Sequence, residues 1–323
     1  MLCVSTRGGQ KAMRMDFGEV RAGARCAVAF GYDVDMPGDF QYLYDRDVPW
    51  RPGGDGPYCH GHLNQDVLGY VKRLVSIAER YGVKLQFFLQ GNTLEDPVEP
   101  WLEIVKADHA VDQHTYTHAH LLRTPLDKVE SEIVRTKRLL EDKLGIVSIG
   151  LRGPGGYAGG LRGRDDAQRV ILNAGIQFVS THYYHYATDQ RFTPEGDNFS
   201  IQKIADSQPF YYDRGLLEIP FCCYSDRQFF DVDQGGRGSK LSVDDWIAYL
   251  KRAVDFAHEG GLLCAFVLHP STSFKHDPEA RYLDELLSYC RQKPGTISCT
   301  FRDIYEWTRE IESGAERVMS SMA

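Results

Sequence analysis

Two residue pairs in this chain have types and spacings that suit metal-assisted hydrolysis. Asp33 and Asp35 end the apolar run CAVAFGYDVD, and because side chains alternate along a strand, both carboxylates would point to the same side. His114 and His118 are four residues apart in VDQHTYTHAH, so on a helical turn both imidazoles would lie on one face and could bind a metal. Two histidines and one carboxylate leave coordination positions open for water and substrate, which is typical of catalytic rather than structural metal sites.

Two further predicted strand ends carry side chains that could join this chemistry. Arg152 begins the RGPGGY segment, whose glycines would let the backbone approach a ligand closely. His269 ends the run LLCAFVLH, where an unpartnered ionisable group is unfavourable unless it emerges into a polar site. Each feature has an ordinary alternative: a solvated turn for the aspartates, surface or packing roles for the histidines, and a tight turn at Arg152. Their shared position at strand ends favours a single active site.

The elements that would position these residues are strands alternating with helices. The apolar patterns predict strands at 26–35, 83–90, 109–114, 147–152, 176–182, 216–221, 262–269 and 296–301. They predict helices at 67–81, 99–107, 125–144 with Thr124 as N-cap, 164–174, 243–259 with Ser242 as N-cap, 278–292, and a last one ending near 312. This alternation favours an α/β fold with a parallel sheet, most simply closed as a barrel.

We find no internal repeat and no linker that would split the chain, so the sequence predicts a single domain. We divide it into an N-terminal extension (1–25), the barrel domain (26–315) and a C-terminal tail (316–323). A long aromatic, Gly- and Pro-rich insertion at 36–62 follows the strand that carries Asp33. It is expected to fold over the mouth of the barrel and narrow it.

Composition excludes several classes of protein. The chain has 323 residues, with 37 basic against 45 acidic side chains and a formal charge of −8, which disfavours binding to nucleic acid or anionic lipid. The absence of a long apolar stretch and of a secretory signal predicts a cytoplasmic protein with no membrane contact. The eight cysteines contain no CxxC and are expected to be buried free thiols.

Read in order, these segments resemble the polysaccharide deacetylase family, also called the NodB-homology or carbohydrate esterase family 4 group. The first family motif is similar to GYDVD, the second to HTYTH, the third to RGP and the fifth to FVLH. The resemblance spans about residues 26 to 312 and implies a distorted, roughly seven-stranded (β/α) barrel. The spaced Asp-x-Asp and the His269-Pro270 pair look more like the intracellular branch, which includes peptidoglycan deacetylase-like proteins, cyclic imide hydrolases and allantoinase-like amidohydrolases.

The resemblance also implies roles for individual residues. Asp33 would be the general base, oriented by Arg152, and His269 would be the general acid, while the backbone N–H of Gly155 would help to hold the oxyanion. One divalent metal ion, zinc by default with cobalt, nickel or iron as alternatives, would be bound by Asp35, His114 and His118. The family's fourth motif, an Asp-Trp pair that tunes the acid histidine, is not recognisable, and Asp206, Asp213 and Glu218 are candidate substitutes for it.

The expected function is therefore hydrolysis of a non-peptide C–N bond, with N-deacetylation of an N-acetylated sugar or short oligosaccharide ahead of cyclic imide or ureide opening. A non-haem iron oxygenase is an alternative with the same ligand set, but it would give Asp33, Arg152 and His269 no role. A non-catalytic sugar-binding relative is a second alternative, but such a protein would lack a metal ligand or the general base, and this sequence has both. Aromatic residues in the predicted loops could stack on a substrate or form a homo-oligomer interface. The candidates for substrate contact are Trp50, Tyr157, Tyr183 and Tyr184.

Overall fold

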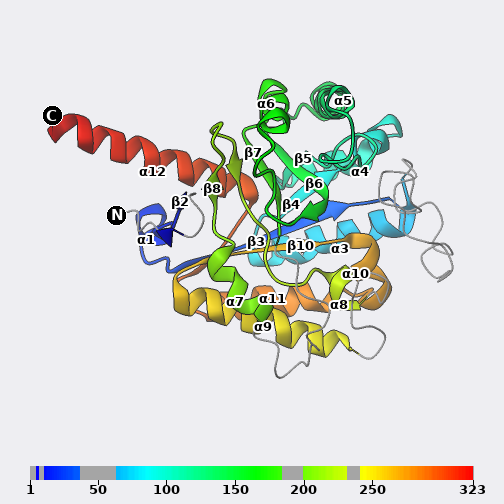
Figure 1. Ribbon diagram of the computed structural model, residues 1–323. Coiled ribbons are helices and arrows are strands. Elements are labelled where there is room, and N and C mark those ends of the chain that lie inside the picture. The colour runs from blue at the N-terminus through cyan, green and yellow to red at the C-terminus, as the bar shows by residue number, and fades with distance from the viewer. Residues whose placement is uncertain (1–4, 7–10, 37–62, 184–198, 231–240, 323) are drawn as a thin grey trace.

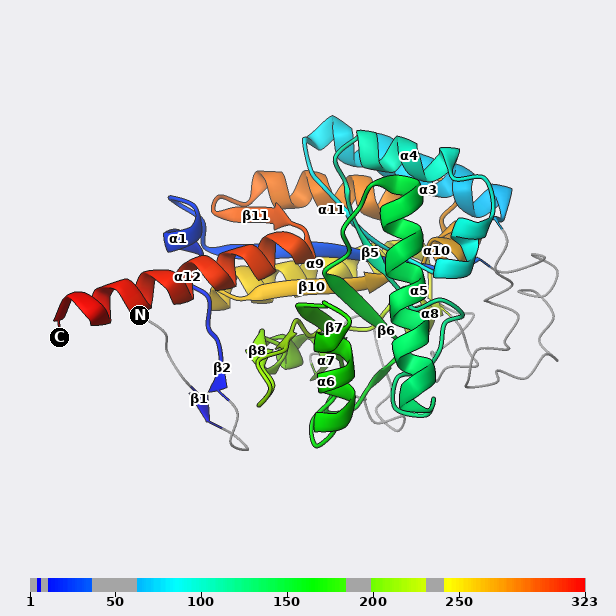
Figure 2. The same cartoon turned by 90° about the horizontal axis from the view of Figure 1, so that it is seen from above.

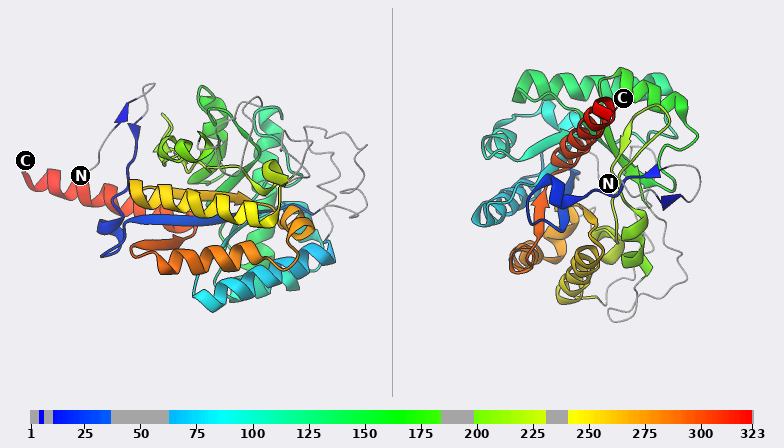
Figure 3. Two further views of the ribbon diagram at one scale, coloured as in Figure 1. Left: turned by 90° about the horizontal axis from the view of Figure 1, so that it is seen from below. Right: turned by 90° about the vertical axis from the view of Figure 1, so that its left-hand side faces the viewer.

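Helices surround a curled sheet in this protein, as the α/β barrel prediction requires (Figure 1; Figure 3, right). The computed structural model describes residues 5–6, 11–36, 63–183, 199–230 and 241–322. Within them, seven strands run parallel in the order β9-β7-β6-β5-β4-β3-β10. These strands are β3 (Cys26–Val34), β4 (Gln86–Leu89), β5 (Ala110–Gln113), β6 (Gly150–Tyr157), β7 (Phe178–His182), β9 (Leu217–Glu218) and β10 (Leu263–Leu268).

Isolated hydrogen bonds connect β10, one end strand of the parallel sheet, to residues before and after β9, the other end strand. No β9–β10 ladder forms among the described residues, but the amide of Cys222 donates to the carbonyl of Ala265 at 2.9 Å. The side chain of Gln208 imitates a neighbouring strand, because its amide nitrogen and oxygen each bond the backbone of Leu263 at 3.0 Å. These contacts satisfy backbone groups of β10 that would otherwise be buried without partners.

The alternation of side chains along β3 explains where its carboxylates lie. Every second residue, Val28, Phe30, Tyr32 and Val34, packs in the apolar cluster formed with the outer helices. The intervening residues are small, since Ala27 and Ala29 pack in the interior of the barrel, and Asp33 continues this inner row. The strand thus delivers a carboxylate to the inner side at the carboxyl end of the barrel, where barrel enzymes place their sites.

The helices cover the outside of the sheet, with α3, α9 and α11 beside β3 and β10 (Figure 2). Asn64 caps α3, and Ser242 and Asp245 form a reciprocal capping box at the start of α9. The helices are α1 (Phe17–Val20), α3 (Gln65–Tyr81), α4 (Glu99–Lys106), α5 (Leu126–Leu144), α6 (Asp165–Asn173), α7 (Phe199–Gln202), α8 (Asp226–Phe230), α9 (Val243–Gly260), α10 (Pro270–His276), α11 (Arg281–Gln292) and α12 (Phe301–Met322).

Several predicted boundaries were wrong for identifiable reasons. Pro125 itself occupies the N-cap of α5 in an extended conformation, so Thr124 does not cap the helix. The predicted strand at 216–221 is regular only at Leu217–Glu218, and α10 was not predicted. The last helix runs to Met322 rather than ending near 312, so the predicted tail continues it.

The two ends of the described chain lie at the end of the barrel opposite to the carboxyl ends of β3 and β10 (Figure 1). The short strands β1 (Ser5–Thr6) and β2 (Lys11–Ala12) pair with each other, and Ala12 pairs with Phe210 of β8 (Phe210–Tyr211). Strand β11 (Thr296–Cys299) pairs with the first half of β3. No described helix has the length and apolar character needed to span a membrane. The six cysteines that the structure describes are buried and free, as predicted.

Candidate active site

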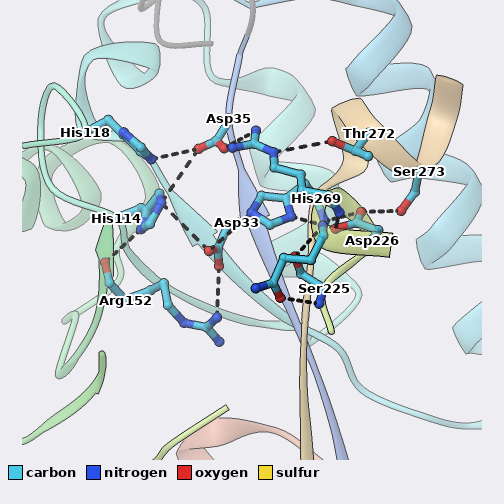
Figure 4. A network of polar contacts seen from close by, with 12 residues as sticks. Asp33, Asp35, His114, His118, Arg152, Ser225, Asp226, His269, Thr272 and Ser273 are labelled. Atoms are coloured by element: carbon cyan, nitrogen blue, oxygen red, sulfur yellow. Dashed lines mark hydrogen bonds and ion pairs between the residues drawn. The ribbon is translucent and has the colours of Figure 1, made fainter. Parts of the chain in front are cut away.

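Asp33 and Asp35 lie at the carboxyl end of β3 and are almost fully buried, with exposed fractions of 4% and 0%. Their two-residue spacing places both beside the same histidine. The Nε2 atom of His114 is 3.9 Å from Oδ2 of Asp33 and 3.7 Å from Oδ1 of Asp35 (Figure 4). Two carboxylates this close in a buried site call for positive charge beside them.

His114 and His118 come together as predicted, but not on a helical turn. His114 directly follows β5, and the chain then bends through Thr115 and His118, whose φ angles of 60° and 62° are left-handed. The Thr115 hydroxyl accepts a hydrogen bond from the amide of Ala119 at 2.8 Å and stabilises this turn. The helical expectation was therefore wrong, and the turn brings the two imidazole centroids to 4.8 Å.

Asp35, His114 and His118 form a three-ligand set that fits a divalent metal ion. Oδ1 of Asp35 lies 3.7 Å from Nε2 of each histidine, and this buried oxygen has no hydrogen-bond partner among the described residues. Ligand atoms that lie 2.0–2.2 Å from a tetrahedral zinc ion are about 3.4 Å from one another. The ligand atoms of this site would need to move only slightly closer together to coordinate the ion. The His114 Nδ1 atom donates to the carbonyl of Arg152 at 2.7 Å, which leaves Nε2 unprotonated and directed at Asp35.

The charge states of these groups suit ligation. Burial lowers the pKa of His118 to about 3, although the charge of Asp35 opposes this shift, so the imidazole is neutral near pH 7. Burial would raise the pKa of Asp35, but the Arg227 guanidinium and the neighbouring histidines outweigh it and hold that pKa well below its usual range. Neutral imidazole and ionised carboxylate are the forms that bind a metal.

Arg152 lies inside β6, opposite Ser180 of β7, rather than in a turn after a strand. Its Nη1 atom is 3.4 Å from Oδ1 of Asp33, and the guanidinium stacks near the rings of Phe88 and Phe221 at 4.7 and 5.0 Å. Gly31 makes room for it, because a Cβ there would lie 2.7 Å from Nη2 of Arg152. The arginine therefore forms an ion pair with one oxygen of Asp33, while the other oxygen faces the histidines.

His269 directly follows β10 and occupies the N-cap position of the next helix, α10. Its Nδ1 atom donates to Oδ1 of Asp226 at 2.7 Å, and its backbone amide donates to Oδ2 at 2.8 Å. Ser273 completes the arrangement by donating to the same Oδ2 at 2.7 Å. The Nε2 atom of His269 consequently faces Asp33, at 3.9 Å from Oδ2.

Asp226 was missed by the sequence reasoning, and so was the adjacent Arg227, which donates to Asp35. None of the three suggested substitutes contacts His269. Glu218 is buried, but it accepts hydrogen bonds from Thr181, His182 and Tyr212. Asp206 pairs with Lys203, and Asp213 is exposed. The available signal was an Asp-Arg pair shortly after a predicted strand, the position shared by the other site residues.

A cavity of about 320 Å³ at the carboxyl end of the barrel is bordered by Asp33, His114, His118, Arg227 and His269. Gly155, with φ of 86°, lies at the irregularity in β6 and lines the cavity, as does Gly156. Tyr183 also lines it and stacks on Phe221 at 5.3 Å. Other lining residues include Gly153, Ser225, Gln228 and Val267.

Of the remaining predicted contact residues, Tyr157 is the one that the structure describes. Tyr157 is not among the residues that line the cavity, because its buried hydroxyl accepts a hydrogen bond from the amide of Leu121 at 3.0 Å. Trp50 and Tyr184 lie outside the described residues, as does all but the first residue of the insertion at 36–62. The expectation that this insertion narrows the mouth stays a prediction.

Comparisons with known proteins agree with the fold. Residues 55–179 match the sequence profile of the family described as "Polysaccharide deacetylase". A curated relative, the YlxY protein of Bacillus subtilis strain 168, to which no function is assigned, is 25% identical over 77 residues; the match covers 24% of this chain and 24% of that protein.

Solved structures show the same fold at low sequence identity. A protein of Mycobacterium smegmatis assigned as a polysaccharide deacetylase has a TM-score of 0.69 and 21% identity, covering 97% of this chain and 96% of that one. The Puue allantoinase has a TM-score of 0.63 and 15% identity, covering 89% of this chain and 91% of that one. A protein of Pseudomonas aeruginosa PAO1, also assigned as a polysaccharide deacetylase, has a TM-score of 0.61 and 16% identity, covering 88% and 91%.

Proposed function

We propose that this chain, which belongs to the polysaccharide deacetylase family, is a metal-dependent hydrolase of a non-peptide amide C–N bond in a small molecule or short saccharide. The observation that carries the proposal is the position of Asp33 Oδ2, 3.9 Å from Nε2 of both His114 and His269. A carboxylate between a metal-ligand histidine and a second histidine can accept a proton on one side of the reacting carbonyl while the other histidine donates one.

The metal would be held by Asp35, His114 and His118, and it would supply Lewis-acid polarisation of the substrate carbonyl. Asp33 acts as general base. It accepts the proton of the attacking water at Oδ2, because Oδ1 is paired with the Arg152 guanidinium. Since this carboxylate is not one of the three ligands, base and ligand functions are carried by different aspartates.

His269 donates the proton that the leaving nitrogen needs. Its Nδ1–H is committed to Asp226, so only Nε2 can exchange a proton with a substrate in the cavity. The buried Asp226 stabilises the protonated imidazole, because its pKa is lowered: burial would raise it, but the charge and hydrogen bonds of His269 outweigh burial. The backbone N–H of Gly155, at the cavity wall, would donate to the developing oxyanion.

The size of the cavity favours a small substrate. About 320 Å³ is at the low end of the range for small-molecule pockets, and its wall combines the glycines with Tyr183, Phe221 and Val267. An N-acetylated sugar is the first candidate class. A cyclic imide or ureide is the second, because a flat ring fits between an aromatic wall and the backbone, and the Puue allantoinase shares the fold.

A substrate panel tests the proposal. It contains N-acetylglucosamine oligomers of increasing length, a nucleotide-linked N-acetyl sugar, succinimide-type imides and soluble glycol chitin, assayed for acetate release or ring opening with Zn²⁺ supplied. We expect a small substrate to be turned over faster than any polymer. Rates that rise with oligomer length and peak on the polymer would contradict the small-substrate proposal.

The location and the partners of the protein follow from its charge and from its expected substrate. We propose a cytoplasmic protein whose partner is its small-molecule substrate, with no role for nucleic acid or membrane, consistent with the formal charge of −8.

A further inference from the structure

We propose that Arg227 is a positioning residue that restricts Asp35 to metal ligation through a single oxygen atom and limits how tightly the site holds its metal. The inference rests on the metal site proposed above. It concerns a residue that none of the recognised sequence motifs contains.

The contact between the two side chains is short and buried. Nη2 of Arg227 donates to Oδ2 of Asp35 at 2.6 Å, and the exposed fractions of the two side chains are 8% and 0%. A charged hydrogen bond shielded from water is strong and directional. Oδ2 of Asp35 is therefore committed to the guanidinium.

The guanidinium is itself fixed from its other side. Nε of Arg227 donates to the hydroxyl of Thr272 at 3.3 Å, in the first turn of α10, three residues after His269. The backbone amide of Arg227 donates to Oδ1 of Asp226 at 3.0 Å. Neighbouring residues of α8 thus contact both the acid histidine and the metal-ligand carboxylate.

The second oxygen of Asp35 is the one that faces the ligand histidines. Oδ1 is buried and is 3.7 Å from Nε2 of His114 and of His118, and no residue in the described part of the chain forms a hydrogen bond with it. A carboxylate can bind a cation through one oxygen or through both. Because Arg227 occupies Oδ2, the geometry presents Oδ1 alone.

The charge of Arg227 has a second consequence for the metal. The guanidinium lies directly behind a ligand carboxylate, and like charges repel strongly where water is excluded. Arg227 should therefore weaken metal binding while it orients the ligand. A residue that only supports the fold would have the opposite effect, because its loss would disorder the ligands and lower the affinity.

The experiment compares the wild-type chain with Arg227→Met and Arg227→Lys. Each protein is stripped with a chelator and titrated with Co²⁺, with Zn²⁺ affinity measured by chelator competition. We expect Arg227→Met to bind metal at least about tenfold more tightly, and its Co²⁺ absorption to weaken as the second oxygen of Asp35 raises the coordination number. Arg227→Lys, which keeps a charge and a donor, should remain close to wild type in both measurements.

Arg302→Met is the matched control. Arg302 also pairs with a fully buried aspartate, Asp112, at 2.8–2.9 Å, but it lies away from the cavity. Its loss should lower the melting temperature without changing metal affinity or the Co²⁺ spectrum. If Arg227→Met does not fold, Arg227→Gln provides the same neutral comparison.

Two results would overturn the inference. In the first, Arg227→Met binds metal more weakly than wild type, as expected for a merely structural role. In the second, its affinity and spectrum are unchanged. A wild-type chain that binds no Co²⁺ or Zn²⁺ would refute the proposed metal site, and this outcome is distinguishable because it precedes any comparison of variants.

Discussion

His269 and Asp226 are joined twice, once through the imidazole Nδ1 at 2.7 Å and once through the backbone amide of His269 at 2.8 Å. The double contact fixes the rotation of the ring as well as its tautomer. If the ring rotated, the carboxylate could keep its hydrogen bond to Nδ1 only by breaking the hydrogen bond from the backbone amide. It connects α8 to the end of β10 across 43 residues of sequence. The account of acid catalysis depends on this pair.

Replacing Asp226 by Asn should slow turnover by about 10² to 10⁴, since the amide cannot stabilise a protonated imidazole and can favour the wrong tautomer. Metal content should stay at the wild-type level, because Asp226 contacts none of the three ligands in the described structure. Turnover and metal content are both measured. Asp206→Asn, an exposed carboxylate paired with Lys203, serves as the control and should leave both unchanged.

Asp33→Asn separates the two aspartates of the first motif. The variant should keep its metal and lose about 10² to 10⁴ in turnover, because asparagine preserves the shape of the side chain but cannot accept a proton. Asp35→Asn should instead lose metal. Metal analysis and turnover on the same preparations distinguish the two losses, and near wild-type turnover by Asp33→Asn would remove Asp33 from the mechanism.

His118→Ala should lower the metal content sharply, since two protein ligands make a poor site. His120→Ala is the matched control from the same segment, because His120 packs against Tyr157, with ring centroids 4.5 Å apart, and is not in the ligand set. Elemental analysis of both purified variants checks this prediction. Unchanged occupancy in His118→Ala would contradict the ligand assignment.

The stability of the fold should fall below neutral pH because of buried histidines. Burial lowers the pKa of His109 to about 4, and its Nδ1 accepts a hydrogen bond from the amide of Leu85 at 2.9 Å. In the unfolded chain the imidazole has a pKa near 6.5, so it binds a proton at a higher pH than it does in the folded protein. The contribution of neutral His109 to the free energy of unfolding is therefore fully present above about pH 6.5 and is lost as the pH falls toward 4.

This histidine alone should lower the free energy of unfolding by about 2 kcal/mol between pH 7.5 and pH 5. In His109→Asn, whose amide oxygen can still accept a hydrogen bond, the decrease should be smaller by about that amount. Denaturant unfolding at several pH values measures the difference. Parallel pH dependences in variant and wild type would show that His109 does not carry the effect.

The sequence predicted the parts of the site that follow regular strands. The apolar run of β3 and the alternation of its side chains located Asp33 and Asp35, and the apolar run of β10 located His269 at its end. Strand ends can be predicted because burial imposes a period on the residues before them. The seven parallel strands of the barrel follow from the same patterns.

Other parts of the site depend on contacts that local sequence does not encode. Asp226 and Arg227 follow an irregular segment after the two-residue strand β9, and their partners are 43 and 192 residues away in sequence. The approach of His118 to His114 depends on left-handed backbone at Thr115 and at His118 itself, a conformation that is uncommon in residues other than glycine. These residues could only be placed once the barrel brought their strands together.

The central claim is that hydrolysis requires one metal ion bound by Asp35, His114 and His118. The most direct test is to strip the protein with a chelator and titrate Zn²⁺ back while following hydrolysis of the fastest substrate in the panel. The account predicts a rate near zero in the stripped protein that rises in proportion to added Zn²⁺ and stops rising at one ion per chain, with no recovery in His118→Ala. A stripped protein that hydrolyses the substrate as fast as the reloaded one would contradict it.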